Sequence, residues 1–407
     1  MQAGYPLPSC PDFVDNLGSR GVGFLETFRE PIHIQLMDSS NMVGKGPGLA
    51  ETEGTVFNVV LVGCGFMART WATHIAGRSD ARMVGLVDVR IENATAFNDE
   101  FCFGAWVSDD YRTIFDHGPL DIVLNTTPPE FHLPISAMAL THGCHVFSEK
   151  PMANTWEECQ DLLMATRRSS RVFAVMQNRR YLESIRSCAA LVRSGLIGRI
   201  GFICADYFMG RENMGGHYQS MASPLLVDMA IHTFDEARFI TDLNAKSVQA
   251  KEFSHPGSDF NGKDSAVCLF EMEGGAMFSY RGCWSAPGAN TPSQGSWRIT
   301  GERGTIIWDG EHYPYLELRG PEKNRYISVD KRVEGQSVYQ GRETYHGCLD
   351  AMFSAVVSGE LPETSSEDNI YSMAMVFAAL ESSRSGARIR ITEAATVTET
   401  IRLEKAT

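Results

Sequence analysis

The sequence predicts an α/β protein with two folded domains: a parallel sheet with helices on both faces, then an α/β domain with a large, mostly antiparallel open sheet. Three observations predict this fold. Residues 57–174 alternate strand-like and helix-like segments, which is typical of βαβ units. The following residues form mostly strand-like runs separated by glycine-containing turns, which is typical of antiparallel pairing. The chain of 407 residues is also long enough for two domains.

Composition excludes several classes of partner. The chain is 43% hydrophobic and 21% charged, as in ordinary soluble globular proteins. A net charge of −14 disfavours nucleic acid and anionic membranes as partners, and no apolar run approaches the ~20 residues of a membrane span. The ten cysteines show neither a C-x-x-C pair nor zinc spacing, so we expect reduced thiols, a cytoplasmic protein and no metal site.

The first folded domain is predicted from five strand-like runs and the helices between them. We expect strands at 58–62, 81–87, 122–125, 145–148 and 172–175, and helices at 134–141 and 156–167. In sheets of this kind the ligand sits beyond the carboxyl ends of the strands. Residues that directly follow a strand are therefore the candidates for function.

The first strand leads into a glycine-rich turn. Residues 59–68 read Val-Val-Leu-Val-Gly-Cys-Gly-Phe-Met-Ala, the strand–turn–helix context in which G-x-G-x-x-A holds a dinucleotide pyrophosphate. Gly63 permits the tight turn, Gly65 removes a Cβ that would block the phosphates, and Ala68 lets helix and strand pack closely. The new helix directs its free N–H groups and positive dipole end at the anion. The predicted cofactor contacts here are Gly63, Gly65, Phe66, Met67 and Ala68.

The second strand ends at Asp88, about 20 residues beyond the glycines, where an acidic side chain binds the adenosine ribose hydroxyls. A carboxylate there would repel a 2′-phosphate, which favours NAD as the cofactor. Arg90 follows two residues later and could pair with such a phosphate, so NADP stays open. The alternative interpretation of Asp88 is a solvated turn residue after a buried strand.

Two further post-strand segments are candidates. Thr-Thr-Pro-Pro follows one strand and Glu-Lys-Pro follows the next; the predicted cofactor contacts in and after them are Thr126, Thr127, Pro128, His132, Glu149 and Lys150. The Lys150 ammonium could bind a substrate hydroxyl and stabilise a developing alkoxide. A cis peptide bond before Pro151 would direct this lysine inward. Taken alone, a surface lysine at a strand end is the simpler interpretation.

The second folded domain is dominated by strands. We expect helices at 184–194 and 369–385, and strands at 200–207, 247–253, 266–271, 276–281, 297–300 and 305–308. Many antiparallel strands with few helices predict one large open sheet with a helical face. The predicted boundaries are an N-terminal extension at 1–55, a dinucleotide-binding domain at 56–176 and a substrate-binding and oligomerisation domain at 177–407.

A short helical segment of the second domain carries Asp228, His232 and Asp235. The spacing of Asp228 and His232 places them on one face of a helix, and Asp235 lies close to that face. A carboxylate one turn from an imidazole can orient it and raise its basicity, as a general base requires. A metal half-site and a satisfied surface pair are the alternatives, and no further ligand has the spacing for a metal.

Five motifs occur in one order: Val-Gly-Cys-Gly-Phe-Met-Ala (62–68), Thr-Thr-Pro-Pro-Glu-Phe-His (126–132), Ser-Glu-Lys-Pro-Met-Ala (148–153), Asn-Arg-Arg-Tyr (178–181) and Asp-x-x-x-His (228–232). In this order they resemble the Gfo/Idh/MocA oxidoreductase family. The resemblance runs from residue 57 to the C-terminus, and its motifs are most specific in the first folded domain.

The resemblance implies a Rossmann domain followed by an α/β domain whose open sheet mediates homodimers or homotetramers. It implies catalytic roles for Lys150, Asp228 and His232, and substrate contacts at Asn178, Arg179, Asp235 and Trp284. The first 55 residues depart from the family's usual short start. They are interpreted either as a flexible tail or as an arm, with residues 32–36 as a short strand, that packs on a neighbouring subunit or over the cofactor.

The activity expected from these residues is hydride transfer between nicotinamide and a secondary alcohol of a sugar, inositol or related polyol. His232, oriented by Asp228, would take the hydroxyl proton, and Lys150 would stabilise the alkoxide. Two alternatives stay open: a glycoside hydrolase that oxidises its substrate transiently with bound NAD, and a cofactor-binding protein without activity. The sequence leaves the substrate open. An acidic one would need cations, which Arg179, Arg180 and Arg211 could supply.

Overall fold

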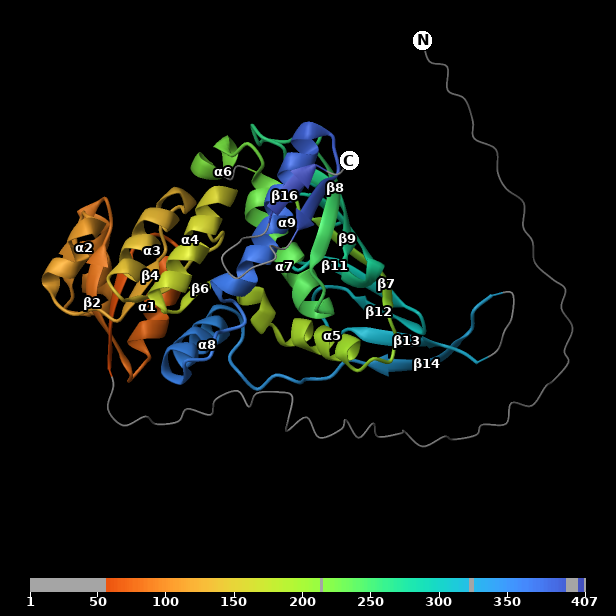
Figure 1. The fold of residues 1–407 in the computed structure, drawn as a ribbon, viewed down its shortest axis with the longest axis horizontal. Coiled ribbons are helices and arrows are strands. Elements are labelled where there is room, and N and C mark those ends of the chain that lie inside the picture. Colours follow the sequence, from red (N-terminus) through yellow and green to blue (C-terminus); the bar gives the residue numbers. More distant parts are fainter. Residues whose placement is uncertain (1–55, 213–214, 322–325, 393–401, 406–407) are drawn as a thin grey trace, which may run out of the picture. The chain divides into compact units, whose positions relative to one another are not determined.

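The computed structural model describes residues 56–405 except 213–214, 322–325 and 393–401, and all of these belong to one compact unit. The predicted N-terminal extension, with its strand at 32–36, lies outside the described residues. Two separate sheets organise the described chain (Figure 1). The predicted fold class is confirmed.

The first sheet has six parallel strands in the order β3-β2-β1-β4-β5-β6. The strands are β1 (Phe57–Val62), β2 (Ala81–Val87), β3 (Trp106–Ser108), β4 (Ile122–Asn125), β5 (His145–Ser148) and β6 (Phe173–Val175). The helices between them are α1 (Ala68–Ala76), α2 (Ile91–Phe101), α3 (His132–Thr141) and α4 (Trp156–Ser169). Along β1, Val60 and Val62 pack into one core and Val59 and Leu61 into another, as expected for a sheet covered on both faces.

The second sheet has ten strands in the order β14-β13-β12-β11-β7-β10-β9-β8-β15-β16. They are β7 (Ile200–Phe208), β8 (Ala245–Phe253), β9 (Ser265–Met272), β10 (Met277–Cys283), β11 (Ser296–Gly301), β12 (Gly304–Trp308), β13 (Tyr315–Arg319), β14 (Val329–Glu334), β15 (Ile389–Thr392) and β16 (Arg402–Lys405). Neighbouring strands are antiparallel except β7 and β10, which pair in parallel. The large, mostly antiparallel sheet is therefore confirmed.

The described helices after β6 are α5 (Glu183–Arg193), α6 (Gly216–Ser220), α7 (Ala230–Thr241), α8 (Thr344–Ser358) and α9 (Ser366–Ser385), of which α8 packs on α1 and on the core of the first sheet. Helix α9 packs on β8 and β15, and α7 packs between α5 and α9 (Figure 1). Every residue of α7 is buried, so this helix runs through the core. Within the described residues, no helix has both the length and the apolar character needed to cross a bilayer.

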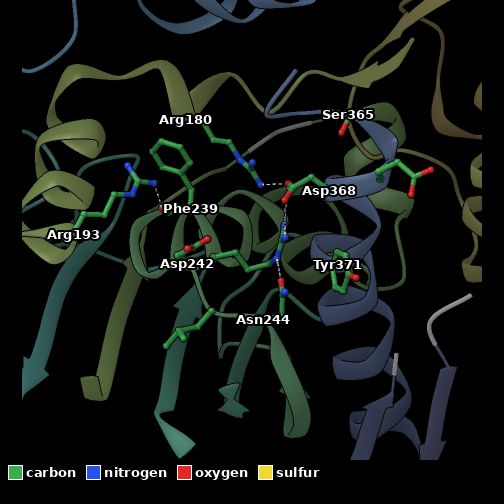
Figure 2. Close-up of a pocket in the computed structure, with 11 residues that line it drawn as sticks. Arg180, Arg193, Phe239, Asp242, Asn244, Ser365, Asp368 and Tyr371 are labelled. Carbon is green, nitrogen blue, oxygen red and sulfur yellow. Dashed lines mark hydrogen bonds and ion pairs between the residues drawn. The ribbon is translucent and has the colours of Figure 1, made fainter. Parts of the chain in front are cut away.

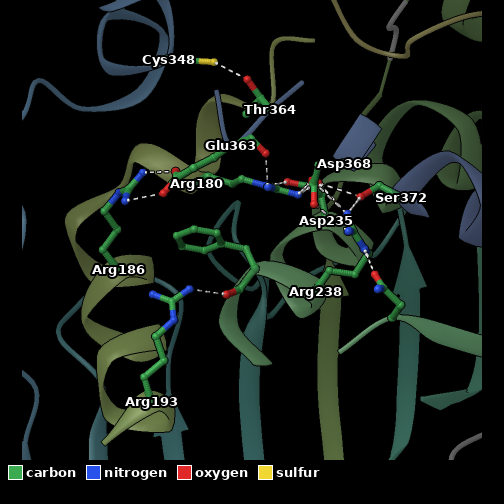
Figure 3. A network of polar contacts seen from close by, with 12 residues as sticks. Arg180, Arg186, Arg193, Asp235, Arg238, Cys348, Glu363, Thr364, Asp368 and Ser372 are labelled. Carbon is green, nitrogen blue, oxygen red and sulfur yellow. Dashed lines mark hydrogen bonds and ion pairs between the residues drawn. The ribbon is translucent and has the colours of Figure 1, made fainter. Parts of the chain in front are cut away.

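A buried ion-pair network ties α7 and α9 to the segment after β6 (Figure 3). Arg180 donates from Nε and Nη2 to the Asp235 carboxylate at 2.7 and 2.6 Å, and from Nη2 to Asp368 Oδ2 at 2.5 Å. Arg238 donates to Asp368 Oδ1 at 2.8 Å, and Ser372 Oγ donates to Asp235 Oδ1 at 2.7 Å. The two guanidiniums lower the pKa of Asp368 although burial opposes this shift.

The prediction that Asp235 binds substrate is corrected by this network. The Asp235 side chain is only 2% exposed, and both of its oxygens accept hydrogen bonds from Arg180. Its negative charge is thus already used inside the protein. Asp235 holds three segments together rather than facing a ligand.

Replacing Asp235 by Asn should destabilise the fold strongly. Loss of one partner leaves the buried Arg180 poorly compensated, and such losses cost about 3–5 kcal/mol. Urea unfolding of the wild type and of Asp235→Asn measures the difference. The control is Glu302→Gln, which breaks an exposed pair with Arg199 and should change the free energy of unfolding by less than about 1 kcal/mol. Equal effects of the two substitutions would contradict the role given to Asp235.

Candidate active site

The glycine turn after β1 is shaped by contact with the segment after β4. Gly63 has φ +95°, and a Cβ there would lie 2.8 Å from the carbonyl carbon of Thr126. The Thr126 hydroxyl donates to the Gly63 carbonyl oxygen at 2.6 Å. Gly63 is therefore required both by its backbone conformation and by the close approach of Thr126.

Gly65 is free of any such internal constraint. A Cβ at this position would meet no protein atom within 4 Å, and the neighbouring Phe66 side chain is 87% exposed. Helix α1 begins at Ala68, so its unpaired N–H groups lie beside this open space. The space, the glycine and the helix start fit a dinucleotide pyrophosphate.

Asp88 lies beside this turn at the end of β2. Its Oδ2 accepts from the Cys64 backbone N–H at 2.9 Å. Its Oδ1 accepts from the Arg90 N–H at 2.9 Å and from Asn93 Nδ2 at 3.1 Å. The carboxylate is thus aimed at the glycine turn, where a ribose would lie. The Arg90 side chain is exposed and forms no hydrogen bond to the described residues, which leaves it available to a 2′-phosphate.

His132 and Glu149 were both predicted to contact the cofactor, but their side chains form hydrogen bonds inside the protein. The imidazole nitrogens of His132 lie 2.7 Å from the Pro151 carbonyl and 2.8 Å from the Thr127 carbonyl. Glu149 accepts a hydrogen bond from Trp71 Nε1 at 2.9 Å, and burial raises its pKa. Both side chains are buried. They position the loops after β4 and β5 rather than touching a ligand.

Lys150 and Asp228 meet across the two domains. The Lys150 Nζ atom lies 2.7 Å from Asp228 Oδ1 and 2.9 Å from the Asp228 carbonyl oxygen. The peptide bond between Lys150 and Pro151 is cis, as expected. Asp228 belongs to a π-helical turn, Leu225–Met229, directly before α7. A single α-helical face for Asp228 and His232, with the carboxylate orienting the imidazole, is therefore wrong: the described partner of the Asp228 carboxylate is Lys150.

His232 lies in the first turn of α7 and is buried. Its Nδ1 atom is buried without a hydrogen-bond partner. Burial and the positive charges of Arg179 and Lys150 hold the pKa of His232 well below its usual value. The imidazole is therefore neutral at neutral pH, the form that can accept a proton.

Arg179 and Glu236 lie beside His232 and extend the site. Arg179 Nη1 donates to Glu236 Oε1 at 3.2 Å. Glu236 stands one helical turn after His232 on α7 and was missed from the sequence, although the i,i+4 spacing was a usable signal. Asn178, from the same short segment as Arg179, is buried, and the structure describes no hydrogen bond of its side chain.

Three tyrosines, also missed from the sequence, lie within electrostatic range of Asp228. Tyr207, Tyr218 and Tyr345 each have a pKa raised partly by the negative charge of Asp228. Trp284, a predicted substrate contact, is buried and stacks on Phe260 with ring centroids 5.3 Å apart.

The edge of Tyr218 meets Trp284 at 5.9 Å. Trp284 therefore backs a tyrosine that lies near Asp228. Its own indole Nε1 is buried and has no hydrogen-bond partner.

A cavity of about 390 Å³ opens elsewhere, between the C-terminal end of α7 and the start of α9 (Figure 2). The arginines that line it are hydrogen-bonded to other groups of the protein. Arg238 binds Asn244, Asp368 and Ser372, and Arg193 donates to the Phe239 carbonyl. Neither Asp228 nor His232 lines this cavity.

Comparison with known proteins identifies the family of both folded domains. Residues 57–177 match the family described as "Oxidoreductase family, NAD-binding Rossmann fold", and residues 185–307 match the "GFO/IDH/MocA C-terminal domain". The chain is 29% identical over 213 residues to D-glucoside 3-dehydrogenase of Escherichia coli strain K12, covering 49% of this chain and 58% of that protein.

Two further similarities extend over most of the chain. It is 26% identical over 337 residues to inositol 2-dehydrogenase 2 of Saccharopolyspora erythraea, covering 81% of this chain and 94% of that protein. A solved structure of levoglucosan dehydrogenase in complex with NADH and levoglucosan has a TM-score of 0.70 and 21% identity, covering 83% of this chain and 99% of that chain.

Alanine substitutions at the two glycines should have separable effects. Gly65→Ala adds a methyl group to open space, so the protein should keep its stability while NADH binds at least tenfold more weakly, because the methyl group occupies the phosphate position. Gly63→Ala should lower the melting temperature as well, because its Cβ collides with Thr126. Thermal unfolding and NADH fluorescence titration measure the two quantities. Unchanged NADH affinity in Gly65→Ala would show that the dinucleotide lies elsewhere.

Proposed function

The chain belongs to the Gfo/Idh/MocA oxidoreductase family, and we propose that it reversibly oxidises a secondary alcohol of a sugar, inositol or related polyol with NAD. The observation that carries the proposal is the contact of Lys150, just beyond the end of β5, with Asp228, together with His232 in the first turn of the helix that follows Asp228; the charge of Lys150 contributes to the low pKa of His232. The names of the relatives support a carbohydrate substrate, since they include a glucoside dehydrogenase and an inositol dehydrogenase.

Each residue of the site has a separate role in the proposed reaction. Bound NAD supplies the hydride acceptor. His232 takes the proton of the substrate hydroxyl, because its depressed pKa keeps it unprotonated before the reaction. Lys150 stabilises the negative charge that develops on the alcohol oxygen. Asp228 acts through Lys150, because its carboxylate and carbonyl oxygens hold the ammonium in place.

Replacing His232 by Ala should lower kcat by about 10²–10⁴-fold and leave the Kd for NADH unchanged. Steady-state NADH formation from a panel of sugars and inositols, run with NAD and with NADP, measures the first quantity; fluorescence titration measures the second. His312→Ala is the control, because His312 is exposed and pairs with Asp309.

Two results of this screen would contradict the proposal. If His232→Ala turns over substrate as fast as the wild type, His232 is not the general base. If glycosides release their aglycone and no NADH accumulates, the protein is a redox-neutral glycosidase and not a dehydrogenase.

We further propose that the protein acts in the cytoplasm as a homodimer or homotetramer assembled through the outer face of the ten-stranded sheet. Reducing compartments keep thiols unpaired, and the nine described cysteines are free thiols. The outer sheet face exposes a group of large apolar side chains: Phe202, Phe253, Val267 and Leu269. Exposed apolar side chains on one face of a sheet are available for protein–protein contacts.

Leu269→Lys should shift the assembled protein toward monomer, because it places a charge in the proposed interface. Sedimentation velocity over a range of concentrations measures the change. Val89→Lys is the control, since Val89 is also highly exposed but lies in the other sheet's domain. A wild type that is monomeric at all concentrations would contradict the proposed assembly.

A further inference from the structure

We infer that the alcohol substrate of this site carries a carboxylate, which Arg179 binds in exchange for its internal partner Glu236. The inference rests on the proposed function and names the substrate class: sugar acids, such as uronic or aldonic acids, rather than neutral sugars. A sugar acid carries a carboxylate and secondary hydroxyls in one molecule. Its carboxylate would bind Arg179 while one of its hydroxyls reacts at His232.

The structure separates the three arginines that could meet an acidic substrate. The Arg180 guanidinium is already hydrogen-bonded to the carboxylates of Asp235 and Asp368. The Arg179 side chain is 11% exposed, and Glu236 is its hydrogen-bond partner among the described residues. A guanidinium has five N–H donors, so most of those on Arg179 remain for a ligand. Arg211 is exposed and its side chain binds no described residue.

Glu236 is a weak counter-ion for Arg179. It makes one hydrogen bond of 3.2 Å to the guanidinium, and its Oε2 atom is buried without a partner. Burial raises the pKa of Glu236 to about 8, so it is mostly protonated at neutral pH. Arg179 then keeps a positive charge without a negative partner. A ligand carboxylate would supply one, with two parallel hydrogen bonds.

The position of Arg179 connects this charge to the chemistry. Its charge lowers the pKa of His232, the proposed base. Arg179 and Arg211 both act on Tyr207, whose pKa also responds to Asp228. Arg179 is hydrogen-bonded to Glu236, which lies one helical turn after His232 on α7, so a carboxylate bound by Arg179 would lie close to the proposed base.

The exchange predicts a particular pH dependence. The charged and titratable groups that act on Glu236 or respond to it are Arg179, Asp235, Tyr207 and Tyr280, and Asp235 is neutralised by its own arginine. Below about pH 8, Glu236 is protonated and Arg179 is available to an anion. Above that pH, Glu236 must take up a proton before the anion binds. The Kd for a sugar acid should therefore rise about tenfold per pH unit.

The first experiment compares matched substrates that differ only in one carboxylate: D-glucose with D-glucuronate, and D-galactose with D-galacturonate. With NAD present, kcat/KM for the acid should exceed that for the neutral sugar by about ten- to a hundredfold. Arg179→Gln should abolish this ratio. A preference for the neutral sugars, or a ratio unchanged in Arg179→Gln, overturns the inference while the proposed function stands.

The second experiment measures binding without turnover. Calorimetric titration of glucuronate and galacturonate into the enzyme–NADH complex between pH 6.5 and 9.5 should give the rise in Kd above about pH 8, and Glu236→Gln should remove it. Glu252→Gln is the control: burial raises the pKa of Glu252 to about 7, but Glu252 is outside the site.

A flat wild-type profile, or the same rise in Glu236→Gln, overturns the exchange. If no sugar or sugar acid yields NADH, the proposed function fails. The titration still decides whether Arg179 and Glu236 form a carboxylate site.

Discussion

The pairing of Lys150 with Asp228 is the interaction on which the proposed active site depends. It joins the segment after β5 to the turn before α7, with Nζ and Oδ1 2.7 Å apart. A mostly buried ammonium needs a counter-charge and further acceptors to offset its lost hydration. Asp228 supplies both, through its carboxylate and its main-chain carbonyl. The pair therefore fixes the second domain against the edge of the first sheet where a dinucleotide is expected.

Hydrophobic patterning predicted the long buried strands well, because both faces of β1 and β4 are apolar. It missed β3, whose three residues are only partly buried, and β14, whose Val-Asp-Lys-Arg-Val-Glu run is mostly exposed. Helix α8 was missed as well. It brings Tyr345 to the site from far along the chain, a contact that depends on tertiary packing and has no local signal.

The motif positions were predicted more reliably than the roles of their residues. His132, Glu149 and Asp235 carry suitable groups for ligand binding, yet each is occupied by internal partners. Those partners, such as Trp71 for Glu149 and Arg180 for Asp235, come from distant segments. A single sequence shows which side chains can form hydrogen bonds, but only the packed structure shows which of them are already satisfied.

The π-helical turn at Leu225–Met229 shifts the side-chain directions of the residues directly before α7. Such turns accommodate one extra residue, and each residue of an α-helix turns the side-chain direction by about 100°. Asp228 in this turn reaches Lys150 of the first domain, and His232 follows four residues later in the first turn of α7. Deleting a single residue there would rotate Asp228 away from Lys150 without disturbing α7. The geometry of the proposed catalytic group thus depends partly on the length of this turn, independently of the identity of its side chains.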